Sequence, residues 1–205
     1  MGYVHTYGLT KEIEKIPAEA FSKIEEIVEK YKDILRFECD EDRAPQITNT
    51  NIRFNGCGEH GYETFSFSVK EETNYCKTNV KSYDAAITKI LLVLFHYIPE
   101  FNLSGDGFWI HKSQADEFNR SGKVELDGYW NEALEYMKDK YGIEFDWYLK
   151  VSKSGGHEYY CMDICRKVIE NATKSKKIQE TKKKDTVSET NKASTDKTST
   201  GKTTK

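Results

Sequence analysis

Polar residues gather around glycines and predicted strand ends between residues 47 and 107. The set that can form one ligand site comprises Asn55, Glu63, Lys77, Tyr83, Asp84 and Asp106, with Trp109 just beyond. Rigid elements that end near one another can direct such groups at one point. A lysine, glycine amides and a helix N-terminus together receive a phosphate, while Tyr83 or Trp109 stacks on a base. The stretch therefore predicts a nucleotide-type ligand site, with Glu63 or Asp106 holding ribose hydroxyls.

The same residues have structural explanations that the sequence leaves open. Asp84 can cap a helix, and Asn55 can form a turn. Lys77 can pair with Glu63 across two strands. A cysteine nucleophile at Cys57 or Cys76 would need a histidine and an orienting acid nearby.

A metal site is a further alternative. Suitable ligand types occur at Glu59, His60, Glu63, His157, Cys161 and Cys165. Their spacing matches neither a pair of cysteines two residues apart nor a zinc-binding helix with two histidines. The prediction therefore contains no catalytic residue, no metal and no cofactor.

The glycines at positions 56, 58 and 61 have the spacing of a dinucleotide-binding loop. In such a loop the glycines lead from a strand into a helix. Here residues 63–69 alternate like a strand, which predicts a hairpin loop between residues 47–55 and 63–69.

Hydrophobic periodicity predicts an amphipathic helix at residues 17–36 and a helix at residues 85–98 that is apolar nearly all round. Further strands are expected near residues 74–80, 101–103 and 145–151, and further helices at residues 113–119 and 127–142. Residues 3–8 are a short strand or an N-terminal arm, in which His5 carries no recognised motif. Residues 159–168 fit a strand or a helix. The fold class is α+β: a mostly antiparallel sheet packed on a central apolar helix, with flanking helices.

Composition divides the 205-residue chain in two. Residues 173–205 are rich in Lys, Ser and Thr and poor in aliphatic side chains, which predicts a disordered tail with a net charge of about +6. Residues 1–172 are predicted to form a single domain with a net charge of about −9, which disfavours specific binding to duplex nucleic acid.

The cellular setting is predicted from the cysteines and the apolar segments. An odd number of cysteines, five, without a signal peptide is typical of a cytoplasmic protein with reduced thiols. The longest apolar run is too short to span a membrane. We therefore expect neither a membrane partner nor an extracellular location.

A resemblance to a group of viral proteins adds to these expectations. The motifs are Phe54-Asn55-Gly56, Glu63-Thr64-Phe65, Cys76-Lys77-Thr78, Tyr83-Asp84 and Asp106-Gly107. Together they resemble small uncharacterised proteins of tailed phages and other large DNA viruses, over residues 50–107. The chain departs from that pattern at Tyr62, where His is usual, and at Ser82, where Pro is usual. The resemblance implies a viral protein that acts in the host cytoplasm, in host takeover or evasion of defence.

These observations predict a host-interaction protein that binds and sequesters a small nucleotide-type ligand, for instance a host immune signal. Two alternatives remain. One is a nucleotide or phosphodiester hydrolase with Glu63, His60 or Asp106 as base or metal ligand. The other is an acidic protein that inhibits a host defence factor by direct contact.

Overall fold

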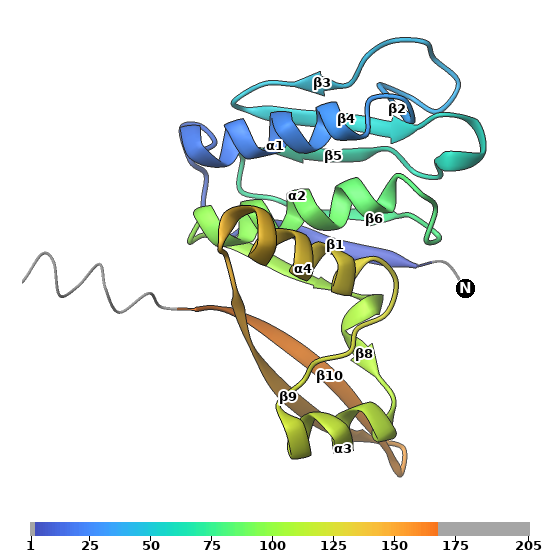
Figure 1. Ribbon diagram of the computed structural model, residues 1–205, viewed down its shortest axis with the longest axis vertical. Helices are drawn as coiled ribbons and strands as arrows, with labels where there is room; N and C mark the ends of the chain where they lie inside the picture. Colours follow the sequence, from blue (N-terminus) through green and yellow to red (C-terminus); the bar gives the residue numbers. More distant parts are fainter. Residues whose placement is uncertain (1–2, 168–205) are drawn as a thin grey trace, which may run out of the picture. The chain divides into compact units, whose positions relative to one another are not determined.

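The apolar helix predicted at residues 85–98 is α2, Asp84–Tyr97, in a computed structural model of the protein. Every residue of α2 from Asp84 to Phe95 is buried. Helices α1, Ala18–Lys30, and α4, Trp130–Tyr141, pack against it (Figure 1). The structure describes residues 3–167, which belong to one compact unit. The predicted tail at residues 173–205 lies outside the described residues.

The first sheet covers α2 with three antiparallel strands. They are β1, Val4–Leu9; β6, Thr73–Lys77; and β7, Phe101–Gly105, in the order β6-β1-β7. Residues 3–8 therefore contain a central strand rather than an arm. Adjacent residues of a strand point to opposite faces. His5, Tyr7 and Leu9 accordingly point inward and are buried, whereas Thr6 points to the outer face.

The second sheet is built around β4, Asn51–Gly56. Strand β4 pairs with β2, Leu35–Arg36, with β3, Gln46–Ile47, and with β5, Phe65–Ser68. β4 and β5 form the predicted hairpin, with Phe54 opposite Phe65 and a short 3₁₀ turn η1, Gly58–His60, in the loop. The helix predicted to reach residue 36 ends earlier, because Leu35 pairs with Gly56 in the sheet.

The third sheet contains β8, Trp109–Ile110; β9, Phe145–Ser154; and β10, His157–Arg166. Its order is β8-β10-β9, which assigns residues 159–168 to a strand over most of their length. Gly155 and Gly156 join β9 to β10 with φ of +57° and +80°, values that a tight hairpin turn requires. η2, Asp106–Phe108, and α3, Lys112–Ser121, complete the elements.

The α+β class is confirmed, with all strand pairs antiparallel in the described part of the chain. The strands form three small sheets, however, rather than the one sheet expected. None of the helices within residues 3–167 has both the length and the apolar character that crossing a membrane requires.

Arg166, near the end of β10, joins the third sheet to the core. Its guanidinium donates to the carbonyls of Phe95 and Ile98, both at 2.6 Å, and to that of Phe101 at 3.1 Å. These carbonyls lie at the end of α2 and the start of β7. One side chain therefore holds β10 beside β7.

Arg166→Met should lower the free energy of unfolding by roughly 2–3 kcal/mol, because charged hydrogen bonds to partly buried carbonyls are lost. Arg120→Met is the matched control, since Arg120 is exposed and bonds Glu117 on its own helix. The control should change stability by no more than about 0.5 kcal/mol. Urea unfolding of both variants measures this, and equal losses would contradict the role of Arg166.

Candidate functional site

Asn55 is buried, and its side chain holds the glycine loop together. Its amide nitrogen donates to the Tyr62 carbonyl and the Thr64 hydroxyl, both at 3.2 Å. Its amide oxygen accepts from the backbone N–H of Gly56 at 2.8 Å and of Tyr62 at 3.2 Å. All polar atoms of the side chain are thus used within the loop, which is the turn-forming alternative rather than the ligand-binding one.

Tyr83 is likewise enclosed by the chain. Its hydroxyl donates to the Glu63 carbonyl at 2.7 Å, and burial raises the pKa of this phenol well above its usual value. The ring is fully buried, so it does not stack on a ligand in solution. Tyr83 fastens the start of α2 to the glycine loop.

Glu63 and Lys77 meet through the backbone. A carboxylate oxygen of Glu63 accepts from the Lys77 N–H at 2.8 Å, and the Glu63 N–H donates to the Lys77 carbonyl at 3.2 Å. The Lys77 ammonium lies 5.9 Å from the centre of the Tyr62 ring. The expected pairing of the two residues therefore does not use the ammonium, which stays near the surface.

The predicted phosphate cradle of glycine amides and helix N-terminus is not available. The N–H groups of Gly56, Gly58 and Gly61 donate to Asn55, Cys39 and Gly58. At the start of α2, the N–H groups of Asp84, Ala85 and Ala86 donate to carbonyls of the preceding turn. Backbone groups that already have partners offer little to an anion. That part of the sequence prediction is wrong.

Asp106 and Trp109 lie apart from the glycine loop. Asp106 accepts from the backbone N–H of Val4 at 2.9 Å and fixes the start of β1. Trp109 lies on β8 in the third sheet, where 52% of its surface is exposed. The structure therefore groups Asn55, Glu63, Lys77 and Tyr83 around one loop and separates Trp109 from them.

Asp84 forms a buried pair with His5, a residue to which the sequence assigned no role. Asp84 Oδ1 lies 2.6 Å from His5 Nε2, and both side chains are fully buried. Within residues 3–167, His5 Nδ1, Asp84 Oδ2 and the indole nitrogen of Trp130 have no hydrogen-bond partner. A histidine paired with a carboxylate in this way resembles the general base of a catalytic site and the acid that orients it. Because the pair is enclosed by β1, α2 and Trp130, its role is instead structural: it holds β1 against α2.

Asp84→Ala should lower the free energy of unfolding by roughly 3–5 kcal/mol, because His5 would remain buried without its partner. Asp106→Ala, which removes the exposed carboxylate that accepts from the Val4 N–H, should cost about 1 kcal/mol. Chemical denaturation of both variants makes the comparison. A fully stable Asp84→Ala protein that had lost only ligand binding would show that Asp84 belongs to a binding site.

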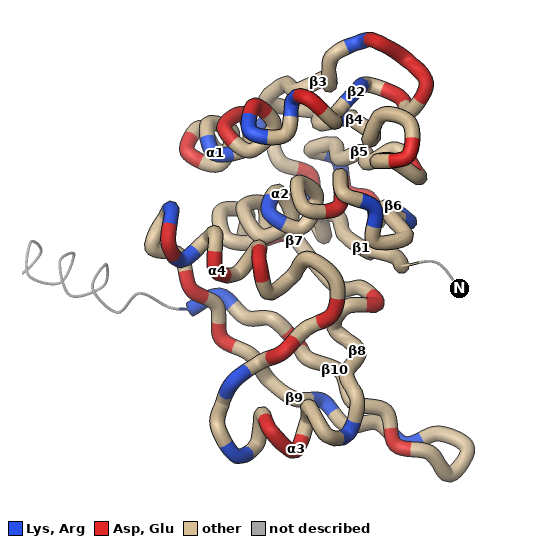
Figure 2. Tube along the Cα trace, turned by 45° about the vertical axis from the view of Figure 1, so that its right-hand side comes forward, with Lys and Arg blue, Asp and Glu red and all other residues tan. Residues whose placement is uncertain are grey.

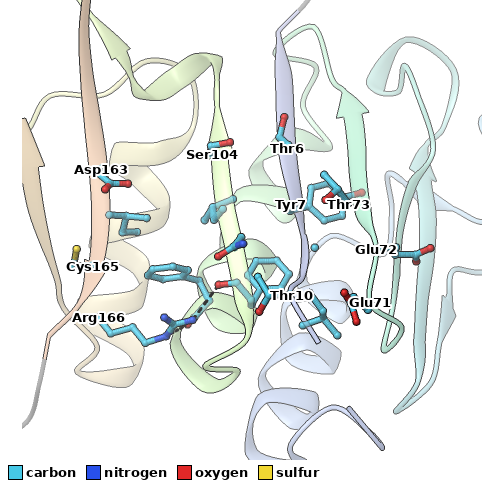
Figure 3. Close-up of a pocket in the computed structure, with 17 residues that line it drawn as sticks. Thr6, Tyr7, Thr10, Glu71, Glu72, Thr73, Ser104, Asp163, Cys165 and Arg166 are labelled. Atoms are coloured by element: carbon cyan, nitrogen blue, oxygen red, sulfur yellow. Dashed lines mark hydrogen bonds between the residues drawn. The ribbon is translucent and has the colours of Figure 1, made fainter. Parts of the chain in front are cut away.

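A groove of about 820 Å³ opens on the outer face of the first sheet and runs from the start of β6 across β1 and β7 to β10 (Figure 3). Its lining is rich in groups that bind hydroxyls and amides: Thr6, Thr10, Glu71, Glu72, Thr73, Asn102, Ser104 and Asp163. Gly8 allows β1 to pass close to the Glu72 backbone, since a Cβ there would lie 1.9 Å from the Glu72 carbonyl oxygen. This volume is within the range of small-molecule sites.

The groove contains none of the predicted ligand residues, but one of them lies on the same face. Thr73 lines the groove, and Tyr75 and Lys77 follow it at alternate positions of β6, while Cys76 between them is buried. Tyr75 is opposite Thr6 in the sheet and is 67% exposed. Tyr75 therefore stands beside the groove, while Lys77 lies further along the same face, with its ammonium near Tyr62.

Small residues, most of them polar, at alternate positions of two segments are the sequence signal that could have indicated this groove. They are Thr6, Gly8 and Thr10 in one segment and Asn102 and Ser104 in the other. Alternation alone indicates only an exposed sheet face. The groove also needs Asp163 and Cys165 of β10, whose position relative to β7 the sequence does not reveal.

The metal alternative lacks a cluster of ligands. Among the described residues, no group of three or more His, Cys, Asp and Glu side chains is arranged to hold a metal ion. His60 Nδ1 lies 2.6 Å from the Ser82 hydroxyl, and the Glu63 carboxylate accepts from Lys77. These side chains are engaged in bonds that shape the loop.

Cys76 is a poor nucleophile in this fold. Burial raises the pKa of its thiol to about 12, so the thiolate is scarce at neutral pH. Its neighbours are the Glu63 carbonyl and the Tyr83 hydroxyl, at 3.6 and 3.9 Å, and no histidine is among the partners of its sulfur.

Native protein treated with iodoacetamide at pH 8 should therefore stay unmodified at Cys76, and unfolding in urea should expose the thiol to alkylation. Peptide mass spectrometry reads each site separately, with partly exposed Cys39 and Cys57 as internal comparisons. Rapid native alkylation of Cys76 would show that the thiol is activated or accessible.

No protein-family model, no curated protein and no solved structure matches this chain. The resemblance to small viral proteins stays a prediction. The groove on the outer face of the first sheet, with Tyr75 beside it and Lys77 further along β6, is the candidate functional site.

Proposed function

We propose that the protein is a binding module that captures a small nucleotide-type ligand in this groove and does not turn it over. The observation that carries the proposal is the combination of a hydroxyl-rich groove with an exposed aromatic ring and a lysine on the same sheet face. Each of these groups suits one part of a nucleotide. Strand alternation fixes their common direction.

The groove itself suits the sugar of the nucleotide. Carboxylates accept hydrogen bonds from ribose hydroxyls, and the lining supplies Glu71, Glu72 and Asp163. Thr6 and Ser104, adjacent in the sheet, offer hydroxyls that both donate and accept. Glu71 and Glu72 repel phosphates, so the charged end of the ligand lies away from these two carboxylates.

The residues of β6 beside the groove suit the base and the phosphate. Tyr75 offers an exposed face for stacking. The Lys77 ammonium, two residues further along the same face, attracts a phosphate. Lys77 thus keeps the role predicted from the sequence, whereas the glycine amides and the start of α2 do not contribute.

Capture without turnover fits the groups present. The groove lining contains no histidine, and the Arg166 guanidinium is occupied by three carbonyls. The described residues also contain no cluster of metal ligands, which a metal-dependent hydrolase needs. A protein that binds a nucleotide and keeps it intact would remove a signal from solution. With the viral resemblance, we propose a host immune signal as that ligand, bound in the host cytoplasm.

A thermal-shift screen with nucleosides, mononucleotides and linear and cyclic dinucleotides tests the proposal. Ligand at 100 times Kd should stabilise the protein by about 2.7 kcal/mol, a rise of several degrees in Tm. Ser104→Trp, which fills the groove, should abolish the shift, and Lys77→Ala should weaken binding of phosphate-bearing ligands. Ser113→Trp on α3 and Lys70→Ala in the loop before β6 are the matched controls and should bind normally.

Analysis of the recovered ligand distinguishes the alternatives. Intact ligand supports sequestration, while cleaved ligand would make the protein a hydrolase. No shift with any of these probes would overturn the proposal. The acidic residues along α1 and in the loop between β2 and β3 (Figure 2) would then make a protein inhibitor the better hypothesis.

A further inference from the structure

The outer face of the third sheet carries exposed aromatic rings that the fold does not need. Trp109, Tyr148 and Tyr159 are 52%, 58% and 45% exposed. The inner face of the same sheet already supplies the apolar contacts to the core, through Trp147, Leu149 and Met162. Aromatic side chains left in water on the opposite face are typical of a contact surface.

Strand register gathers these rings on one face. Trp109 and Lys150 are both opposite Cys161, and Tyr148 is opposite Asp163. Residues directly opposite each other point to the same side. Tyr159, two residues before Cys161 on β10, points to that side as well. The aromatic rings therefore surround Lys150 and Cys161.

This face continues into the groove. Asp163 and Cys165, which follow Cys161 at alternate positions of β10, line the groove opposite Ser104 and Thr6 (Figure 3). Trp109 is the diagonal neighbour of Asp163, at roughly 7–8 Å for such positions. The aromatic face thus begins at the wall of the groove formed by β10.

Lys150 supplies a cation at this boundary. Its ammonium lies 2.5 Å from a carboxylate oxygen of Asp163 and is largely exposed. Surface ion pairs of this kind are weak and open readily to a competing anion. The β10 side therefore repeats the combination of an aromatic ring and a lysine found on the β6 side, where Tyr75 and Lys77 follow Thr73 along the outer face.

We propose that the ligand is a dinucleotide, with one base at Tyr75 and the second base stacked on Trp109. This inference rests on the proposed function and specifies its ligand class. The groove between the two aromatic sites holds the sugars. Lys77 and Lys150 bind the phosphates at its two sides, and the phosphate at Lys150 displaces Asp163. A mononucleotide fills only one of the two aromatic sites.

Titration calorimetry with linear and cyclic dinucleotides of adenine and guanine, each beside its mononucleotide, tests this. The dinucleotide with the highest affinity should bind at least about 10-fold more tightly than its own mononucleotide, because one more base is stacked. Trp109→Ala should weaken dinucleotide binding by about 10-fold and change mononucleotide binding less than about 2-fold. Trp109→Phe should restore most of the loss.

Control variants on the opposite face of the same sheet separate binding from folding. Val151→Ala and Lys153→Ala alter exposed side chains of β9 that point away from Trp109 and Lys150. Both variants should bind the dinucleotide as tightly as the unaltered protein does, whereas Lys150→Ala should weaken dinucleotide binding. All variants should keep the same Tm without ligand.

The outcomes separate this inference from the proposed function. Equal affinity for both ligand classes, with no effect of Trp109→Ala, would overturn the dinucleotide inference and leave a mononucleotide site intact. Loss of mononucleotide binding in Trp109→Ala would also overturn it, since Trp109 would then belong to the first site. Failure of every nucleotide to bind would overturn the proposed function itself.

Discussion

The burial of α2 is the constraint on which the rest of the structure depends. Its side chains from Asp84 to Phe95 are all buried, so the helix needs cover on every side, which no single sheet provides. The sheet of β1, β6 and β7 covers one side, and α1 and α4 pack along others. The two buried charged side chains of the helix are each paired, since Asp84 lies 2.6 Å from His5 and Lys89 bonds Glu132 at 2.8 Å. Cover from several elements explains why the strands are divided among small sheets.

Features that depend on neighbouring residues were predictable from the sequence. The apolar helix, the hairpin around the glycines and the α+β class follow from periodicity and turn residues close together in the chain. Boundaries set by distant partners were not. The first helix ends before Leu35 because that residue pairs with Gly56, and residues 159–168 become a strand because β9 pairs with them. Local propensity is weak against such pairing.

The candidate site was only partly predictable for a related reason. A polar residue beside a glycine turn can bind a ligand or the turn itself, and sequence patterns do not distinguish the two. Asn55 and Tyr83 bond the loop, and only Lys77 of that group lies on the groove face. The groove joins residues near positions 6, 72, 103 and 164, so it exists only once the sheets are packed. Arg166 of β10 contributes to that packing, because its guanidinium donates hydrogen bonds both to the end of α2 and to the start of β7.

The two faces of β1 connect stability with binding. His5 and Tyr7 point inward, where one pairs with Asp84 and the other stacks on Phe65 with ring centres 4.9 Å apart. Thr6 points outward and, with the backbone of Gly8, lines the groove. A shift of one residue in register would exchange these sets, placing His5 in the groove and Thr6 against the core. The buried pair of His5 and Asp84 therefore fixes which groups the groove presents. A ligand that binds there meets a floor already held in place, so little ordering entropy opposes its capture.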